Sequence, residues 1–270
     1  MMPNRVALVT GAARMRGIGF AVAEVLAANG MSVALADLSP QVRDAEASLT
    51  SKGHTARAFR ADLSKLDEAK AIAGELVREF GQIDALVNVA GGSIPPRPAF
   101  LEMSEAYWDQ VMDRNLRTTV NCCWAVLPTM MAQRAGRVVN VSSITARFVY
   151  RHSAAYAAAK AAIGALGRAL ALEMGEYNIT VNTILPGDID TADTPSNPAD
   201  RRDLGALAPS LATPISSPGL PTDVAELVRF LVLTDTKFIT GTEIMVDGGA
   251  SIVEPYLVEK TFSHKLRGDG

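Results

Sequence analysis

Short apolar segments alternate with helical segments along nearly the whole chain, and this order is the strongest constraint on the fold. Strand-like segments occupy 5–10, 31–37, 54–62, 83–91, 138–143, 179–187 and 243–249, and helical patterns occupy 20–30, 40–52, 64–80, 104–133, 154–176 and 222–235. Strict alternation of this kind is typical of a parallel sheet with helices on both faces. We therefore expect an α/β protein built on one doubly wound parallel sheet, without internal repeats.

The chain is predicted to form a single domain over residues 1–251. Residues 188–220 are rich in Pro, Ser, Asp and Ala and have little periodicity. An irregular segment of this length in a compact domain is usually a functional lid or a disordered loop. We interpret it as a substrate lid, and we expect Thr222 to cap the helix that follows.

Composition limits the classes of partner. The chain has 270 residues, a net charge of −3 and no dense cluster of Lys and Arg, which argues against nucleic acid and membrane surfaces. The first residues, MMPNR, lack the features of a signal peptide, and no apolar run approaches the roughly 18 residues of a membrane-spanning helix. Cys122 and Cys123 are neighbours on a predicted helix and are expected to pack in the core. We expect a soluble, cytoplasmic protein.

A glycine-rich turn, GAARMRGIG, joins the first strand to the first helix. Gly11, Gly17 and Gly19 let the backbone approach a phosphate there, and the helix start supplies free N–H groups and a positive dipole. The next strand ends in Asp37, close to the offset of about 20 residues at which an acidic side chain takes the ribose hydroxyls of NAD. A flexible turn would explain glycines alone, but all these features in one βαβ unit predict a nucleotide site.

The alanine-rich segment 154–172 is predicted to form a long helix, because it is composed of strong helix formers and contains no proline. Tyr156 and Lys160 stand four residues apart and therefore share one face of that helix. A nearby ammonium group favours the phenolate, so we expect Lys160 to lower the pKa of Tyr156. The preceding strand ends in two serines, at the edge where a parallel sheet places its ligands.

These residues belong to a longer ordered pattern, and with it the chain resembles the short-chain dehydrogenase/reductase family from Arg5 to about Ala250. The matching motifs are TG…GIG at 10–19, Asp37, ADL at 61–63, NVAG at 88–91, Asn115, VSS at 141–143, YAAAK at 156–160, PG at 186–187 with Thr191, and TG…VDGG at 240–249. The resemblance implies a Rossmann fold and hydride transfer to or from a nicotinamide cofactor. It also implies a homotetramer, in which the tail 252–270 reaches a neighbouring subunit.

Carried over to this sequence, the resemblance implies a catalytic tetrad of Asn115, Ser143, Tyr156 and Lys160. Tyr156 would exchange a proton with the substrate oxygen, and Ser143 would hydrogen-bond that oxygen. Lys160 would also hold the nicotinamide ribose, and Asn115 would bind a water that links Lys160 to solvent. Ser143 is preferred over Ser142 by its spacing from Tyr156, and Ser142 is expected to point to the other side of the sheet.

The resemblance further implies which residues bind the cofactor. They are Gly11, Gly17 and Gly19 at the pyrophosphate, with Arg16 and Ile18 in the same turn, Asp37 and Leu38 after the second strand, Asp62 and Leu63 at the adenine, Asn88, Ala90 and Gly91 at the adenosine ribose, Tyr156, Lys160, Pro186 and Gly187 at the nicotinamide end, and Ile189 and Thr191 at its carboxamide. Asp37 opposes a 2′-phosphate by like charge, so NAD(H) is favoured over NADP(H). The turn is longer than the family pattern, however, and brings Arg14 and Arg16 near the site, which would favour NADP(H).

Three functional hypotheses follow. The leading one is an NAD(H)-dependent oxidoreductase that interconverts a small-molecule secondary alcohol and a ketone. An alternative enzyme is an NADPH-dependent 3-oxoacyl-(acyl carrier protein) reductase, in which Arg134 would serve the carrier. A third alternative is a cofactor-binding regulator without turnover. His152 either lines the substrate pocket or is an exposed loop residue, and we predict no metal site, because the carboxylates after Gly187 have no His or Cys ligands beside them.

Overall fold

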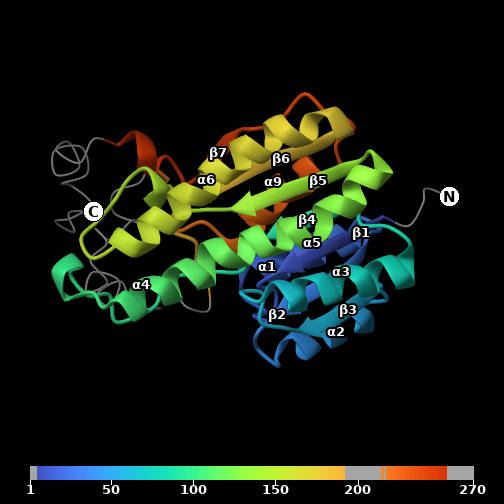
Figure 1. The fold of residues 1–270 in the computed structure, drawn as a ribbon, viewed down its shortest axis with the longest axis horizontal. Coiled ribbons are helices and arrows are strands. Elements are labelled where there is room, and N and C mark those ends of the chain that lie inside the picture. The colour runs from blue at the N-terminus through green and yellow to red at the C-terminus, as the bar shows by residue number, and fades with distance from the viewer. Residues whose placement is uncertain (1–4, 192–213, 216, 254–270) are drawn as a thin grey trace, which may run out of the picture.

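The sheet has seven parallel strands in a computed structural model that describes residues 5–191, 214–215 and 217–253 (Figure 1). Its strand order is β3-β2-β1-β4-β5-β6-β7. The strands are β1 (Val6–Thr10), β2 (Ser32–Asp37), β3 (Ala56–Arg60), β4 (Ala85–Asn88), β5 (Gly136–Val141), β6 (Ile179–Pro186) and β7 (Glu243–Val246). The order reverses between β1 and β4, so the expected doubly wound sheet, a Rossmann fold, is confirmed.

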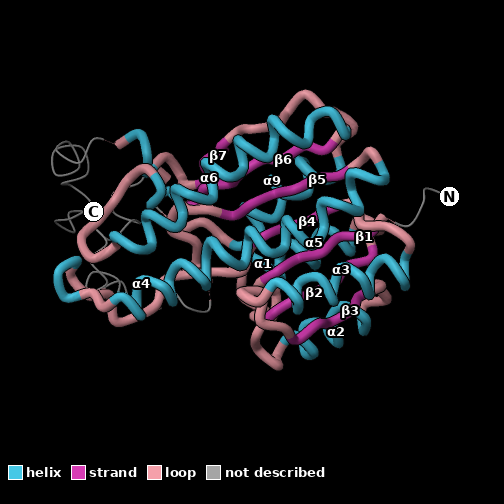
Figure 2. The backbone as a smooth tube through the Cα atoms, in the orientation of Figure 1, coloured by secondary structure: helices cyan, strands magenta, loops and turns pink. Residues whose placement is uncertain are grey.

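Helices cover both faces of the sheet (Figure 2). Buried side chains of α1 (Ile18–Ala28), α2 (Val42–Ser51) and α9 (Pro221–Leu233) form one hydrophobic core with the sheet. Those of α3 (Leu66–Phe80) and α5 (Thr118–Gln133), with one residue of α6 (Ala154–Met174), form a second core on the opposite face. A shorter helix, α4 (Glu105–Met112), precedes α5. The inner strands β1, β2, β4, β5 and β6 are almost completely buried, which explains their nearly continuous apolar sequences, whereas the edge strands β3 and β7 are only partly buried.

The predicted helix over 104–133 is confirmed, and it contains one irregular turn. A π-helical turn, Asp113–Arg117, joins α4 to α5 and carries Asn115. The backbone carbonyl of Asn115 accepts hydrogen bonds from the Thr118 hydroxyl at 3.0 Å and from the Thr119 hydroxyl at 3.1 Å. Two threonine hydroxyls thus bond to a backbone carbonyl of the irregular turn.

The start of α9 differs from the prediction. Leu220, and not Thr222, is the residue that caps this helix. Pro221 occupies the first helical position, where a backbone N–H would have no helical partner, so proline costs no hydrogen bond there. The carboxylate of Asp223 then accepts the Leu220 N–H at 2.7 Å, which replaces a hydroxyl cap.

Helix α6 also corrects an expectation. With the turn that follows it, the stretch Ala154–Tyr177 is long and apolar enough, by length and composition alone, to cross a membrane. Its alanines raise the mean hydropathy, yet the helix packs on β6 and carries the buried Lys160. It is therefore a core helix of the α/β fold.

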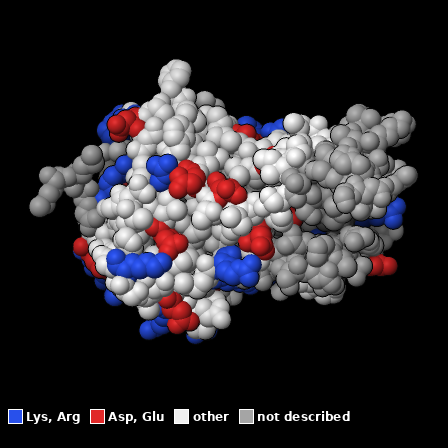
Figure 3. Space-filling model, turned by 180° about the vertical axis from the view of Figure 1, so that it is seen from behind, with Lys and Arg blue, Asp and Glu red and all other residues white. Residues whose placement is uncertain are grey.

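On the face opposite to that of Figure 1, positive and negative side chains are interspersed (Figure 3).

Candidate functional site

A cleft of about 1160 Å³ lies at the carboxyl ends of the strands. The reversal of strand order between β1 and β4 opens an α/β sheet at this edge. Most residues predicted from the sequence line this one cleft: Gly11, Gly17, Ile18, Gly19, Asp37, Leu38, Asp62, Leu63, Ala90, Gly91, Ser143, Tyr156, Lys160, Pro186, Gly187, Ile189 and Thr191. The fold thus brings together side chains that are up to 180 positions apart in the chain.

The glycine turn after β1 is shaped for close backbone contact. A Cβ on Gly19 would overlap the carbonyl oxygen of Gly11, and Gly11 itself has φ +69°. The two extra residues of the turn are accommodated by a hydrogen bond from the Gly17 N–H to the Arg14 carbonyl at 2.8 Å. These features let a ligand approach the backbone closely at the N-terminus of α1, which fits a pyrophosphate.

Thr10 connects this turn to the neighbouring strand end, a role that sequence reasoning missed. Its buried hydroxyl accepts the N–H groups of Val89 and Ala90, both at 3.0 Å. The sequence signal was the TG pair itself, because a threonine at a strand end can bond to backbone groups of the adjacent strand. Thr10 therefore holds two walls of the cleft together.

Asp37 lies at the end of β2 and faces the cleft. Its carboxylate accepts the Ala13 N–H at 3.0 Å and the Ser39 N–H at 2.9 Å, so its position is determined by the glycine turn as well as by the strand. Of the two arginines in the lengthened turn, Arg14 lines the cleft. Arg16 does not, and its guanidinium lies 3.4 Å from Asp190 in a mostly exposed pair.

Asn88 is placed differently from its predicted role at the cofactor. Its side chain is buried in the sheet, where it donates a hydrogen bond to Asn140 at 2.9 Å across the β4 and β5 pairing. Side chains alternate between the faces of a strand, so Asn88 points into the core while the turn after it, with Ala90 and Gly91, reaches the cleft.

Asn115 is fully buried, and its side chain bonds to the backbone of the turn after β4. Its amide oxygen accepts the Gly92 N–H at 2.9 Å, and its amide nitrogen donates to the Gly92 carbonyl at 3.2 Å. A Cβ on Gly91 would lie 2.7 Å from the Asn115 amide oxygen and 3.3 Å from the Lys160 ammonium. The turn after β4 thus passes between Asn115 and Lys160, and only glycine fits there.

Tyr156 and Lys160 converge as predicted, with the Lys160 Nζ 5.7 Å from the centre of the Tyr156 ring. The expected depression of the tyrosine pKa is wrong, however. Burial raises the pKa of Tyr156 to about 12, although a hydrogen bond with Ser143 opposes the rise. Burial also lowers the pKa of Lys160 to about 8, and its ammonium donates to the Val141 carbonyl at 3.0 Å. Loss of hydration on burial shifts the two pKa values more than the two groups shift each other. The spacing of the residues along a helix does not reveal this burial.

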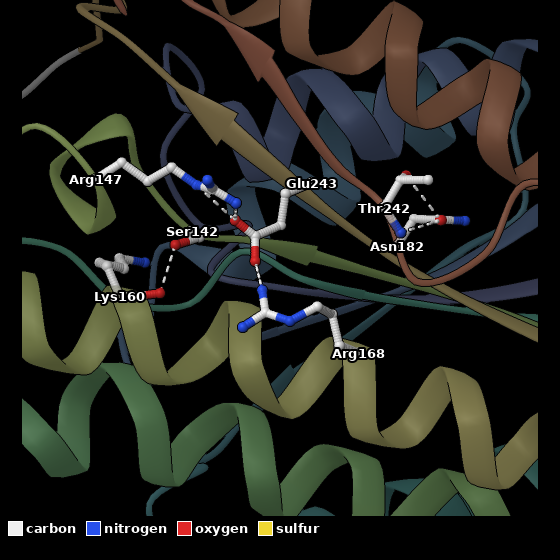
Figure 4. Close-up of polar contacts among 7 residues, drawn as sticks. All are labelled: Ser142, Arg147, Lys160, Arg168, Asn182, Thr242 and Glu243. Atoms are coloured by element: carbon white, nitrogen blue, oxygen red, sulfur yellow. Dashed lines mark hydrogen bonds and ion pairs between the residues drawn. The ribbon is translucent and has the colours of Figure 1, made fainter.

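The two serines after β5 take separate roles. Ser143 contacts Tyr156 and accepts the Thr145 N–H at 3.1 Å. Ser142 was expected on the other side of the sheet, but its hydroxyl donates to the Lys160 carbonyl of α6 at 2.7 Å (Figure 4). The strand has ended at Val141, so the strict alternation of side chains no longer applies.

Replacing Lys160 with methionine should stabilise the protein. The lowered pKa disfavours the charged form in the folded state, by roughly 3 kcal/mol at pH 7. After the loss of the bond to Val141, about 2 kcal/mol should remain, which corresponds to a rise of about 5 °C in the melting temperature. Because the unfolded state binds this proton more tightly, the advantage should shrink as the pH rises from about 8 to 10.5.

Thermal unfolding at pH 7 and pH 10 measures this effect. The exposed Lys70 provides the control, since Lys70→Met should change the melting temperature by no more than about 1 °C at either pH. A Lys160→Met variant less stable than the parent at pH 7 would contradict the explanation by burial.

Comparisons with known proteins agree with this geometry. A family described as Enoyl-(Acyl carrier protein) reductase matches residues 11–251. The chain is 36% identical, over 92% of its length and 99% of the relative's, to the 3-oxoacyl-[acyl-carrier-protein] reductase FabG of Staphylococcus aureus. It is 37% identical to the short-chain reductase protein NovJ of Streptomyces niveus, covering 90% and 93% of the two chains. The chain belongs to the short-chain dehydrogenase/reductase family.

A solved member is similar over nearly the whole fold. The acetoin dehydrogenase of Enterobacter cloacae has a TM-score of 0.82 and 32% identity, over 94% of this chain and 98% of that one. As a short-chain dehydrogenase/reductase, the protein is an oxidoreductase of CH–OH groups that uses a nicotinamide cofactor. The cleft fits such a dinucleotide, because glycine is required where the backbone approaches at Gly19 and Gly91.

Other predicted features are settled only in part. Cys122 and Cys123 are free and buried, and burial raises the pKa of the Cys123 thiol to about 12, which confirms packing in the core. His152 is exposed and does not line the cleft. Among the described residues, no cluster of His, Cys, Asp and Glu could hold a metal ion. Most of the predicted lid over 188–220 and nearly all of the tail over 252–270 lie outside the described residues, and both stay predictions.

Proposed function

We propose that this protein interconverts a secondary alcohol and a ketone with NAD(H), with Tyr156 as the general acid and base. The observation that carries the proposal is the meeting of Ser143, Tyr156 and Lys160 in the cleft that also contains the glycine turn and Asp37. A bound nicotinamide would supply or accept the hydride. The glycine turn and Asp37 suit binding of the dinucleotide, and Ser143, Tyr156 and Lys160 suit proton transfer to the substrate oxygen.

In the direction of ketone reduction, Tyr156 donates its phenolic proton to the oxygen of the substrate. Its raised pKa keeps the phenol protonated at neutral pH, so the proton is available. Ser143 hydrogen-bonds the same oxygen as negative charge develops on it. Lys160 would hold the nicotinamide ribose and the turn after β4 the adenosine ribose, and Asn115 supports that turn through Gly92. In oxidation the step is reversed, and the phenolate form of Tyr156 accepts the proton of the alcohol.

The preference for NAD(H) rests on Asp37. A 2′-phosphate beside this carboxylate would meet a like charge, and at about 4 Å in a partly buried site the repulsion is roughly 4 kcal/mol for each pair of unit charges. Arg14 also lines the cleft and would favour the phosphate. We rank Asp37 first because the strand end and two backbone N–H groups hold its carboxylate in place.

The second candidate is an NADPH-dependent 3-oxoacyl-(acyl carrier protein) reductase. The relatives of that description, at 36% identity over nearly the whole chain, favour it. Arg134, the residue suggested to serve the carrier, is exposed; its guanidinium donates to the Glu176 carbonyl at 2.8 Å and lies 5.8 Å from the centre of the Tyr177 ring. A regulator without turnover would need neither Tyr156 nor Ser143 in the cleft.

We further propose a cytoplasmic homotetramer. Trp124 on α5 and Leu172 on α6 are 55% and 86% exposed, which is unusual for large apolar side chains and suits a contact between subunits.

Calorimetric titration with NADH and NADPH, followed by steady-state assays, tests the proposal. We expect NADH to bind at least about tenfold more tightly, and turnover with secondary alcohols or ketones. Tighter binding of NADPH, with turnover of a 3-oxoacyl thioester, would favour the second candidate. Tight binding of either cofactor without any turnover would favour the regulator.

A further inference from the structure

A nearly buried carboxylate stands beside the proposed active site without being part of it. Glu243, at the start of β7, has a side chain that is only 9% exposed. One of its oxygens accepts both Nε and Nη2 of Arg147, at 3.0 and 2.7 Å, and the other accepts Nη1 of Arg168 (Figure 4). Two guanidinium groups therefore compensate one desolvated charge, as burial of a carboxylate requires.

The residues around Glu243 leave space for its carboxylate and hold its strand in place. A Cβ on Gly164 of α6 would lie 2.6 Å from one of its carboxylate oxygens, so a glycine in the helix makes room for the group. The backbone of Glu243 pairs with Thr183 of β6. The preceding residue, Thr242, donates its hydroxyl to Asn182 at 3.0 Å (Figure 4). The carboxylate thus stands on a firmly held strand.

The two arginines belong to different parts of the site. Arg168 lies on α6, the helix that carries Tyr156 in its first turn. Arg147 lies four residues after Ser143, at the end of the 3-10 turn Ile144–Ala146, and its contact with Glu243 spans 96 positions. Through Glu243, the loop that begins at Ser143 is therefore tied to β7, and Arg168 reaches the same carboxylate from α6.

The other end of this loop is anchored separately. Tyr150 accepts a hydrogen bond from Arg97 on its hydroxyl at 2.7 Å, and its carbonyl accepts the Ser153 hydroxyl at 2.6 Å. Between the anchors at Arg147 and Tyr150, the side chains of Phe148 and Val149 are 46% and 71% exposed. The loop packs little apolar surface of its own here, so its geometry depends on the polar anchors.

We propose that Glu243 is a positioning residue, which acts through Arg147 to hold Ser143 in line with Tyr156. The proposal rests on the proposed function, because Ser143 and Tyr156 are taken as the groups that share the substrate oxygen. Neither Glu243 nor Arg147 lines the cleft, so their influence on the reaction is indirect.

A matched pair of variants tests it. Arg147→Met and Arg168→Met each remove one arginine from Glu243, and the two side chains are similarly exposed, at 50% and 54%. We expect Arg147→Met to lower kcat roughly tenfold, since loss of alignment slows a reaction even when binding persists. Arg168→Met should leave kcat within about twofold, with a similar change in melting temperature, because Arg147 still holds the loop.

Glu243→Gln separates positioning from direct contact with substrate. It should lower kcat about as much as Arg147→Met does, and the double variant should be little worse than either single one, because both changes break the same link. Arg147→Lys should recover part of kcat. If Arg147 bound substrate itself, Arg147→Met would raise KM while Glu243→Gln would not, and the proposal would be wrong.

Hydrogen–deuterium exchange gives a readout that needs no turnover. The amides of Ala146, Arg147 and Phe148 are bonded within the loop, to the Ser143 and Ile144 carbonyls. Their exchange should accelerate roughly tenfold in Arg147→Met and Glu243→Gln but not in Arg168→Met. Unchanged exchange would overturn the positioning role. A parent protein without turnover on any substrate would instead contradict the proposed function, and the exchange experiment would still decide this inference.

Discussion

Replacing Tyr156 with phenylalanine is expected to lower kcat by about a thousandfold and to leave cofactor binding nearly intact. A positioned general acid contributes roughly 10²- to 10⁴-fold to a rate, and phenylalanine keeps the ring but removes the proton. The dinucleotide would still meet the glycine turn, Asp37 and the ammonium of Lys160, so its affinity should change by less than about threefold. Steady-state kinetics and calorimetry with NADH measure the two quantities.

Tyr107 provides the matched control for this variant. Its hydroxyl donates to the Ile94 carbonyl at 2.7 Å, in the segment that follows the turn after β4. Tyr107→Phe removes the same atom near the site without touching the proposed proton transfer, so kcat should stay within about threefold of the parent. Near-normal turnover of Tyr156→Phe would show that the proton comes from another group.

Replacing Asp37 with asparagine is expected to reverse the cofactor preference. The change removes the negative charge that opposes a 2′-phosphate, and the amide oxygen can still accept one of the two backbone N–H groups that hold the carboxylate. We expect the affinity for NADPH to rise by about 100-fold, which corresponds to roughly 3 kcal/mol of relieved repulsion. The affinity for NADH should fall by no more than about tenfold, through weaker bonds to the ribose hydroxyls.

The control for Asp37 is a nearby carboxylate outside the cleft. Asp44 lies on α2 beside the glycine turn, and Asp44→Asn changes the net charge equally. Its effect on the ratio of NADPH to NADH affinity should be less than about twofold, because an exposed charge is screened. A parent protein that already prefers NADPH would mean that Arg14 outweighs Asp37, and the second candidate function would then lead.

Local pattern was enough to predict most of the cleft. The glycines at 11, 17 and 19 follow a strand and precede a helix, and only a few backbone arrangements satisfy that order. Tyr156 and Lys160 share a helix face through their spacing alone. Where a prediction depended on periodicity within one element, as in the helix over 104–133, the structure agrees.

The errors share one origin, which is that burial and side-chain direction depend on neighbours distant in the chain. The pKa of Tyr156 rises because the packed site excludes water, which no spacing along a helix can show. Glu243 had no local signal at all, since its two arginines lie 96 and 75 positions away.

By itself, the sequence determined the parallel α/β architecture, the dinucleotide turn and the identity of the residues at the strand ends. These follow from hydrophobic alternation and from glycines that only certain backbone conformations require. Only the tertiary structure decided which of those residues face the cleft, how burial shifts their pKa values, and how Glu243 of β7 holds the Ser143 loop through Arg147. Desolvation and contact between distant segments arise only when the chain is packed, and they govern the chemistry of the site.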